Sequence, residues 1–195
     1  MSLTILEAES FKQRLERMYE YQDKRHKWPN IVAVRSRPEG RNTIIKESFL
    51  GNNIVTNDGD IYYSIKGAGG SPATNENFIQ GRLELRTSSA TPAKADTYAQ
   101  ITGVQSTTRH AIDAGYPKTP DTDTDNTAGG SKIVSYRYSY LTSEGNVNGI
   151  LGGAIHDNAS PVSGTKLLCH FTISTFDKTN SDTMKFFCNH SYLGA

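Results

Sequence analysis

Residues 132–141 read KIVSYRYSYL, and this stretch decides the fold class. Two sets of side chains alternate along it: Val134, Tyr136, Tyr138 and Tyr140 on one side, and Ile133, Ser135, Arg137 and Ser139 on the other. Successive side chains of a β-strand point to opposite faces, so one face would be aromatic and the other mostly polar. The alternation predicts a strand whose aromatic face is buried.

Six further strands are predicted in the same part of the chain, separated by clusters of Gly, Pro, Asn, Asp, Ser and Thr. They cover residues 61–66, 82–86, 98–104, 150–156, 166–174 and 183–192. Seven short strands with turn signals between them are typical of an antiparallel β-sandwich, either immunoglobulin-like or jelly-roll-like. We expect this mainly β domain to span residues 51–195.

The last two predicted strands suit a hairpin that turns at residues 177–180. That register would place three pairs of side chains opposite one another on one face: Cys169 and Cys188, Phe171 and Phe186, and Ile173 and Met184. A slip of one residue would break this facing of apolar on apolar side chains. The sequence therefore predicts a hydrogen-bonded C-terminal hairpin.

Residues 1–50 differ in character from the rest. Residues 3–23 predict a helix with an apolar stripe of Phe11, Leu15 and Met18. Residues 24–46 carry seven Lys or Arg against one Glu and include a short apolar run at 31–34. We expect an N-terminal helix and an extended basic attachment arm that residues 51–195 do not need in order to fold.

This predicted arm has three interpretations: a solvated charged segment, a DNA contact, or a docking element for another protein. Aromatic residues between the basic ones are few, which makes direct nucleic-acid binding the weaker functional interpretation. Docking is favoured because the apolar stripe needs a partner surface and is contiguous with the basic run. The predicted partner-binding residues are Phe11, Leu15, Met18, Arg35, Arg37 and Arg41.

Two cysteines provide neither a disulfide framework nor a four-ligand zinc site. Cys169 and Cys188 could act as a nucleophile or as a metal pair with His170 and His190, or they could be two small apolar residues of the core. Free cysteine buries readily, and in the predicted register His170 points away from Cys169. We expect two buried, reduced thiols and no cofactor.

Asp121, Asp123 and Asp125 alternate as the first ligands of a calcium loop do. That loop requires Gly at its sixth position and Glu at its twelfth, and Asn126 and Lys132 stand there instead. The three carboxylates are therefore weak metal candidates, and a solvated turn is the simpler interpretation. We expect residues 115–130 to form an ordered loop at a subunit contact, facing basic residues of a neighbour or a cation.

Signatures of catalysis are missing from the sequence. There is no Gly-x-Ser-x-Gly elbow and no His-Glu-x-x-His motif. His156-Asp157 is expected in a turn, and the glycines at 67–70 precede no helix that could hold a phosphate. Net charge is +1, and no stretch approaches the ~20 apolar residues that span a bilayer. We expect no catalytic residues and no membrane partner.

Residues 51–195 resemble a β-rich domain found in structural proteins of tailed bacteriophages. The stretches that carry the resemblance are GNNIVT at 51–56, KADTY at 94–98, AGYPKT at 114–119, DTDN at 123–126, VSYRYSY at 134–140, GTKLL at 164–168 and FDKTNSDTM at 176–184. They are turn and strand signatures and carry no catalytic information. Residues 1–50 have no counterpart in this resemblance.

The resemblance implies a non-enzymatic, homo-oligomeric virion protein, assembled in the cytoplasm of a host bacterium. Its partners would be other copies of itself and the major capsid, connector or tail proteins of the phage. A capsid cement or decoration protein is the first expectation, because a compact domain plus an arm can bridge coat subunits. The alternatives are a neck, tail or fibre component, including a receptor- or glycan-binding module that uses Tyr98, Tyr116 and Tyr140. An enzyme that degrades the cell wall is a third class, for which the sequence offers no acid/base pair.

Overall fold

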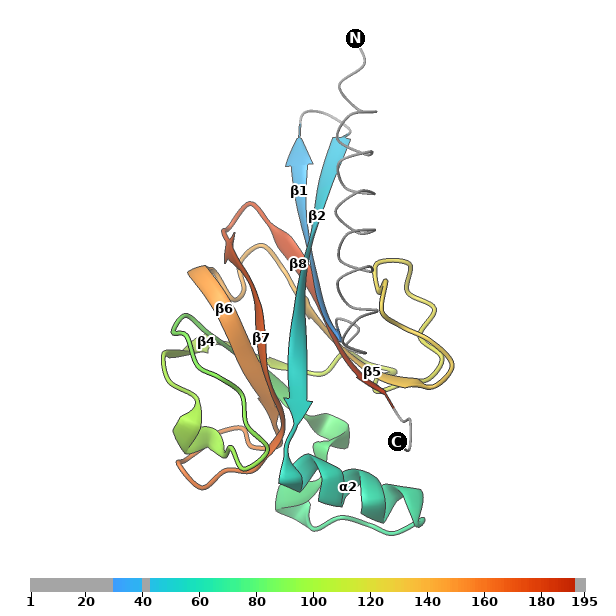
Figure 1. Cartoon of the computed structure of the whole chain (residues 1–195). Coiled ribbons are helices and arrows are strands. Elements are labelled where there is room, and N and C mark those ends of the chain that lie inside the picture. Colours follow the sequence, from blue (N-terminus) through green and yellow to red (C-terminus); the bar gives the residue numbers. More distant parts are fainter. Residues whose placement is uncertain (1–29, 40–42, 192–195) are drawn as a thin grey trace, which may run out of the picture.

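The computed structural model describes residues 30–39 and 43–191, in which eight strands form one antiparallel sheet in the order β4-β3-β6-β7-β2-β1-β8-β5 (Figure 1). The strands are β1 (Ile31–Glu39), β2 (Thr43–Val55), β3 (Arg82–Arg86), β4 (Val104–Ala111), β5 (Ile133–Tyr140), β6 (Val147–His156), β7 (Leu167–Lys178) and β8 (Thr183–Ser191). The prediction of a mainly β chain is confirmed. The strands belong to one curled sheet, however, and are not divided into the two sheets of a sandwich.

Two strands, β2 and β1, lie between β7 and β8 in the sheet, and the sheet curls so that β7 and β8 face each other. β7 pairs with β6 and β2, whereas β8 pairs with β1 and β5, so the predicted hydrogen-bonded hairpin between β7 and β8 is wrong. Two of its three facing pairs are nevertheless present across the core. The rings of Phe171 and Phe186 lie 5.2 Å apart between centroids, and the Sγ atoms of Cys169 and Cys188 lie 3.4 Å apart. The two strands therefore face each other through their side chains.

β1 lies inside the sheet, between β2 and β8, and its first four residues are buried on both faces. Ile31 and Ala33 belong to the main core, and Val32 and Val34 pack with Phe187 in a smaller cluster on the opposite face. The boundary expected between residues 50 and 51 falls inside β2. The described part of the expected basic arm is thus a central hairpin of the sheet, while the predicted helix at 3–23 and residues 40–42 lie outside the described residues.

Two predicted strands have a different structure. Residues 61–66 lie in the helix α2 (Asn57–Gly67), which begins where the Thr56 hydroxyl accepts a hydrogen bond from the Gly59 amide. Asp58 and Asp60 in the first turn and Lys66 in the last complement the helix dipole. Residues 98–104 contain the 3₁₀ turn Tyr98–Gln100, and β4 starts only at Val104. Two other 3₁₀ turns, Thr74–Glu76 and Phe78–Gln80, follow α2.

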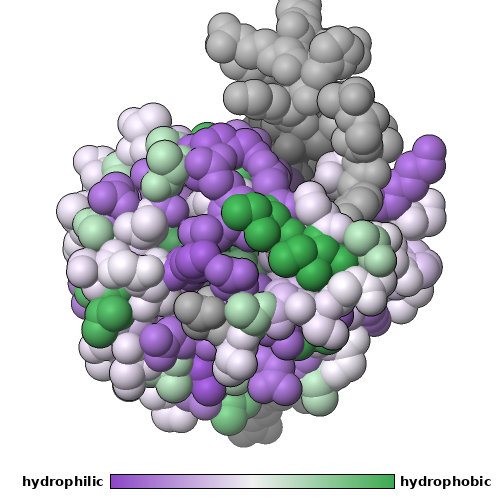
Figure 2. All heavy atoms as spheres, turned by 90° about the horizontal axis from the view of Figure 1, so that it is seen from below, coloured by the Kyte–Doolittle hydropathy of each residue, from purple (hydrophilic) through white to green (hydrophobic). Residues whose placement is uncertain are grey.

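α2 covers one end of the sheet and packs closely on β7 (Figure 1). A Cβ atom at Gly59 would lie 2.2 Å from the carbonyl oxygen of Leu168, so only glycine allows this approach. Tyr62 is buried against the edge of Phe78. Viewed from this end, the surface shows an elongated hydrophobic patch among polar side chains (Figure 2). Ile61 of α2 and Ile79 of the following 3₁₀ turn are 49% and 41% exposed.

The central position of β1 predicts a large difference between two isoleucines of the same hairpin. Ile31→Ala should lower the free energy of unfolding by about 2–5 kcal/mol, because Ile31 is fully buried in the main core. Ile44→Ala should change it by less than about 0.5 kcal/mol, because Ile44 is 64% exposed. Urea unfolding followed by circular dichroism measures both. Equal, small effects would mean that residues 31–34 are not core.

Candidate functional site

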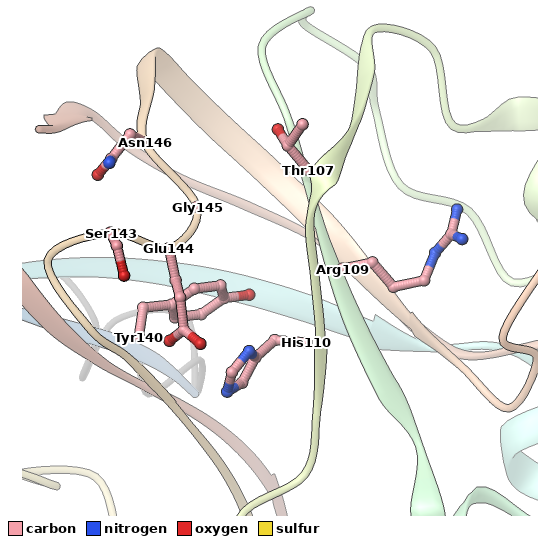
Figure 3. A pocket seen from close by; sticks show the side chains of 8 residues that line it. All are labelled: Thr107, Arg109, His110, Tyr140, Ser143, Glu144, Gly145 and Asn146. Carbon is pink, nitrogen blue, oxygen red and sulfur yellow. The ribbon is translucent and has the colours of Figure 1, made fainter. Parts of the chain in front are cut away.

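An open pocket of about 430 Å³ lies between β4 and the loop that follows β5. Figure 3 shows Tyr140, His110 and Glu144 gathered on one side of it, with Arg109 pointing away. The His110 and Tyr140 rings are 4.6 Å apart between centroids, and Glu144 accepts a hydrogen bond from the Leu141 amide. The Tyr140 hydroxyl donates to the Thr108 carbonyl, so the polar groups of Tyr140 and Glu144 are both bonded to the backbone of the same chain.

Arg109 forms an ion pair with a buried carboxylate, that of Glu84 in β3. Glu84 accepts hydrogen bonds from Arg109 at 2.8 Å and from the Tyr98 hydroxyl at 3.0 Å, and its Oε2 lies 3.1 Å from His156 Nε2. Burial raises the pKa of Glu84, but the hydrogen bonds outweigh it and the net shift is downward. His156, expected in a turn, is the buried last residue of β6, and it bonds Glu84 rather than forming a dyad with Asp157. The cluster ties β3, β4 and β6 together.

His170, one of the two histidines considered beside the cysteines, has a different partner. Its Nδ1 lies 2.7 Å from Oδ2 of Asp96, and both residues are buried. Asp96 also accepts a hydrogen bond from the Ala93 amide, so the carboxylate fixes a loop as well as the imidazole. As predicted from the alternation of β7, His170 points away from Cys169.

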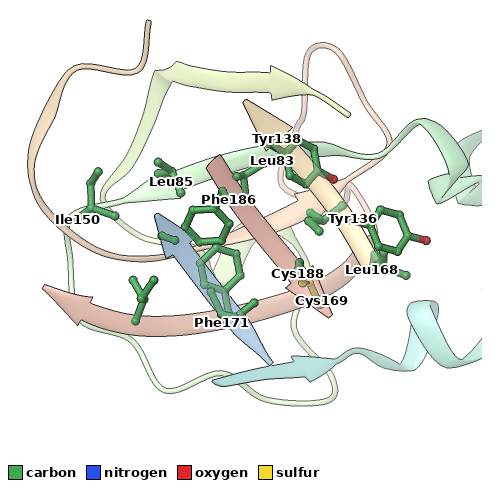
Figure 4. Close-up of a cluster of buried hydrophobic side chains, with 14 of the residues drawn as sticks. Leu83, Leu85, Tyr136, Tyr138, Ile150, Leu168, Cys169, Phe171, Phe186 and Cys188 are labelled. Atoms are coloured by element: carbon green, nitrogen blue, oxygen red, sulfur yellow. Dashed lines mark hydrogen bonds between the residues drawn. The ribbon is translucent and has the colours of Figure 1, made fainter. Parts of the chain in front are cut away.

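His190 instead reaches the cysteines, a grouping that the sequence allows but favours less than two simple core thiols. Its Nε2 lies 3.2 Å from Cys188 Sγ, and Cys188 Sγ lies 3.4 Å from Cys169 Sγ. We call these three residues the thiol centre; their donor atoms all lie within 4.8 Å of one another. Figure 4 shows the two cysteines side by side in the core, between Leu168 and Phe171. The expected burial of both thiols is confirmed.

Two polar side chains orient the thiol centre. The Tyr63 hydroxyl is hydrogen-bonded to His190 Nδ1, which turns Nε2 toward Cys188. Asn53 accepts a hydrogen bond from Asn30 through its amide oxygen and so directs its NH₂ group to Cys188 Sγ, at 3.3 Å. Both arrangements place a specific atom against sulfur.

The surroundings shift the pKa values of the two thiols in opposite directions. Burial disfavours the thiolate of Cys169, but hydrogen bonds involving Cys188 and His190 outweigh it and lower the pKa of Cys169 to about 5. Burial and the neighbouring Cys169 raise the pKa of Cys188. A single negative charge shared by the pair is thus favoured over two.

The predicted acidic loop is neutralised within the chain. Asp123 accepts hydrogen bonds from Arg137 at 3.0 Å and Lys185 at 2.9 Å, and Asp125 pairs with Lys185 and Lys46. Burial raises the pKa values of both carboxyls, but these partners lower them to a net downward shift.

Asp121 accepts hydrogen bonds from the Tyr116 hydroxyl and the Asn126 amide, and its Oδ1 lies 3.4 Å from Lys118 Nζ. Within residues 30–39 and 43–191, Asp121, Asp123 and Asp125 do not form a group whose carboxylate oxygens could share one ion; only the thiol centre meets that geometric condition.

The arginines predicted to bind a partner are also engaged inside the chain. Arg35 bonds Glu47 at 2.9 Å, and Arg37 bonds Asp182 at 2.7 Å. Arg41, with Phe11, Leu15 and Met18, lies outside the described residues. Arg35 therefore joins the two strands of the β1–β2 hairpin, and Arg37 fastens the hairpin to the loop between β7 and β8.

No protein-family model, curated protein or solved structure matches this chain. In the described part of the chain, no helix is long and apolar enough to cross a membrane.

The Glu84 cluster predicts a specific loss of stability in acid. A carboxyl whose pKa is lower in the folded than in the unfolded state stabilises the fold above its ordinary pKa, here 4.5, and loses that effect as pH falls further. Glu84→Gln should lower the free energy of unfolding by about 1–3 kcal/mol at pH 7 and flatten its decline below pH 4.5. Denaturant titrations across this range, with Glu47→Gln as the exposed control, measure both effects. An acid slope identical to that of the unaltered protein would contradict this role for Glu84.

The acidic loop makes a second prediction. Asp123→Asn should lower the free energy of unfolding by about 1–2 kcal/mol, because it weakens bonds to two cations at a carboxylate that is 9% exposed. Asp60→Asn is the matched control, since Asp60 and Lys94 form an ion pair in which both side chains are more than half exposed. That control should change stability by less than about 0.5 kcal/mol. Thermal or urea unfolding distinguishes the two; a harmless Asp123→Asn would mean that the loop is merely solvated.

Proposed function

We propose that this chain is a non-enzymatic structural protein of a tailed-phage virion, a cement or decoration protein that attaches to the capsid through the β1–β2 hairpin. The hairpin is the observation that carries the proposal. β1 pairs with β8 only from Ile31 to Ser36, and β2 pairs with β7 only from Gly51 to Val55. Beyond these limits residues 37–39 and 43–49 pair with the other strand of the hairpin alone.

We call these residues the projecting end. Its outer part, residues 37–39 and 43–45, extends past β8, which pairs with β1 only as far as Ser36 (Figure 1). Within the described residues, the edge of β2 at 43–49 has no strand partner on the side away from β1. An unpaired edge is a template for pairing with a strand of another protein. The projecting end therefore offers main-chain hydrogen bonds to a neighbour.

The side chains of the projecting end suit an apolar partner surface. Ile44 is 64% and Ile45 38% exposed, and as neighbours in a strand they point to opposite faces. The hairpin thus shows an isoleucine on either face. Its described cations are bound to Glu47, Asp125 and Asp182 of the same chain, which favours attachment by burial and strand pairing over attachment by charge.

The resemblance to phage structural domains identifies the larger assembly in this proposal, and the hairpin supplies the mode of attachment. A neck or tail location would use the same hairpin. The glycan-binding alternative loses support, because Tyr116 and Tyr140 are buried and their hydroxyls bond Asp121 and the Thr108 carbonyl. These two rings are not offered to a sugar.

Attachment can be tested with purified particles and the full chain. Replacing both Ile44 and Ile45 by Lys should weaken sedimentation with particles by at least about tenfold, because two buried apolar contacts and a paired edge are lost. Ile79→Lys is the matched control: Ile79 is 41% exposed but lies beside α2, away from the hairpin. It should bind normally.

Undiminished binding of the double variant would overturn attachment through the hairpin. The copy number per particle, measured by mass spectrometry, tests the location separately. Hundreds of copies indicate the capsid, and about 6–12 indicate a neck or tail ring. Absence from particles would overturn the virion assignment.

A further inference from the structure

The thiol centre places three soft or borderline donor atoms around one point in a closed part of the core. Cys169 and Cys188 are fully buried, and His190 is 2% exposed. They come from two strands, β7 and β8, that are not hydrogen-bonded neighbours. Their side chains meet only because the sheet curls.

We propose that Cys169, Cys188 and His190 bind one Zn²⁺ ion, which joins β7 to β8 across the core. In a tetrahedral zinc site, bond lengths of about 2.3 Å to sulfur and 2.0 Å to nitrogen place ligand atoms roughly 3.5–3.8 Å apart. The distances here are 3.4 Å between the sulfurs and 3.2 Å from Cys188 Sγ to His190 Nε2. Both distances are within a few tenths of an ångström of the tetrahedral values, and all three donor atoms lie within 4.8 Å of one another.

The net charge of the buried site favours a divalent over a monovalent thiophilic ion. Two thiolates, a neutral imidazole and Zn²⁺ sum to zero, which is the condition for burying ions at low cost. A monovalent thiophilic ion such as Cu⁺ would leave one negative charge in the core. Calcium and magnesium require oxygen ligands, which the centre does not contain. The three protein donors occupy three of the four tetrahedral positions.

The surrounding groups are those expected outside a metal's first ligands. A zinc-bound histidine commonly has a hydrogen bond at its other nitrogen, and here Tyr63 provides it at Nδ1. Asn53 donates an N–H to Cys188 Sγ, which stabilises a thiolate. An ordinary pair of core cysteines would need neither group.

A disulfide fits the geometry less well. Its S–S bond of about 2.05 Å would require the sulfurs to approach by more than an ångström, and it would leave His190 Nε2 without a partner. Zinc uses all three residues where they are. Mass spectrometry of the denatured chain distinguishes the two states. A disulfide lowers the mass of the chain by two hydrogen atoms, whereas zinc that is released on denaturation leaves two reduced thiols.

The full chain should be unfolded under reducing conditions, refolded with equimolar Zn²⁺ or with a chelator, and passed through a desalting column. We expect one zinc per chain by elemental analysis, and a higher midpoint of thermal unfolding than for the chelated protein. Refolding with Co²⁺ should produce a thiolate-to-metal charge-transfer band. This optical test requires no substitution, so it remains decisive if a variant fails to fold.

Variants identify the ligands. Cys188→Ser and His190→Gln should lose stoichiometric metal, and Tyr63→Phe should weaken binding by about 10–100-fold, as loss of a supporting hydrogen bond does. His170→Gln is the matched control: His170 is a buried histidine next to Cys169 in sequence but is bonded to Asp96. It should retain one zinc per chain.

Refolded protein that contains no zinc and shows no cobalt–thiolate band would overturn the proposal. So would a mass that shows a disulfide in protein isolated without reductant, or full zinc retention in Cys188→Ser. None of these outcomes bears on attachment through the projecting hairpin, which the particle assay tests separately.

Discussion

The structure depends on the insertion of β1 and β2 between β7 and β8. Residues 179–182 form a loop short enough to close a hairpin, yet the strands that it joins pair with other neighbours. Asp182 stabilises this arrangement from inside the loop, where it accepts hydrogen bonds from the Thr179 amide and hydroxyl and from Arg37 of β1. Burial opposes ionisation of Asp182, but these bonds lower its pKa. The loop is thereby fastened to the strand that separates its two arms.

This insertion also explains the composition of the core. With β1 and β2 between them, β7 and β8 turn their apolar faces toward each other and enclose Phe171, Phe186 and the cysteines. β1 itself is covered on both faces, which accounts for the uninterrupted apolar run at 31–34. The same run looked like a minor strand of a basic arm because the charges around it dominate the local sequence. Those charges are ion pairs that fix the hairpin.

The sequence predicted those strands that are marked by a local pattern, either an alternation of side chains or turn residues at both ends. Residues 133–140 alternate strictly, and β3, β6, β7 and β8 are bounded by turn residues, so all five were found close to their observed limits. α2 was missed because Ile61, Tyr62 and Tyr63 favour strands, although Thr56 and two aspartates mark a helix start. The order of the strands in the sheet could not be predicted from the sequence, because a short loop between two apolar strands normally closes a hairpin.

The candidate site was half predictable for the same reason. Cys188 and His190 are two residues apart in one strand and must share a face, a signal that the sequence contains. Cys169 facing Cys188 also followed from apolar matching, although through a wrong hairpin. What could not be predicted was the contribution of Tyr63 and Asn53. They come from the missed helix and the missed strand β2.

The buried carboxylates and the buried thiols of this core have different partners, and the difference supports a ligand at the thiol centre. Glu84 is matched by Arg109, Asp182 by Arg37, and Asp96 by His170, so each buried acid has a cationic or imidazole partner in the described chain. Each of these acids also accepts a further hydrogen bond, from the Tyr98 hydroxyl, the Thr179 amide or the Ala93 amide, which helps to offset the cost of burying its charge. Around Cys169 and Cys188 the groups are arranged differently: the Asn53 amide and the His190 ring are aimed at sulfur, and both favour negative charge there. Among the described residues, no Lys or Arg side chain bonds to either sulfur. A bound cation would supply to the thiols the positive charge that Arg109 supplies to Glu84 and Arg37 to Asp182.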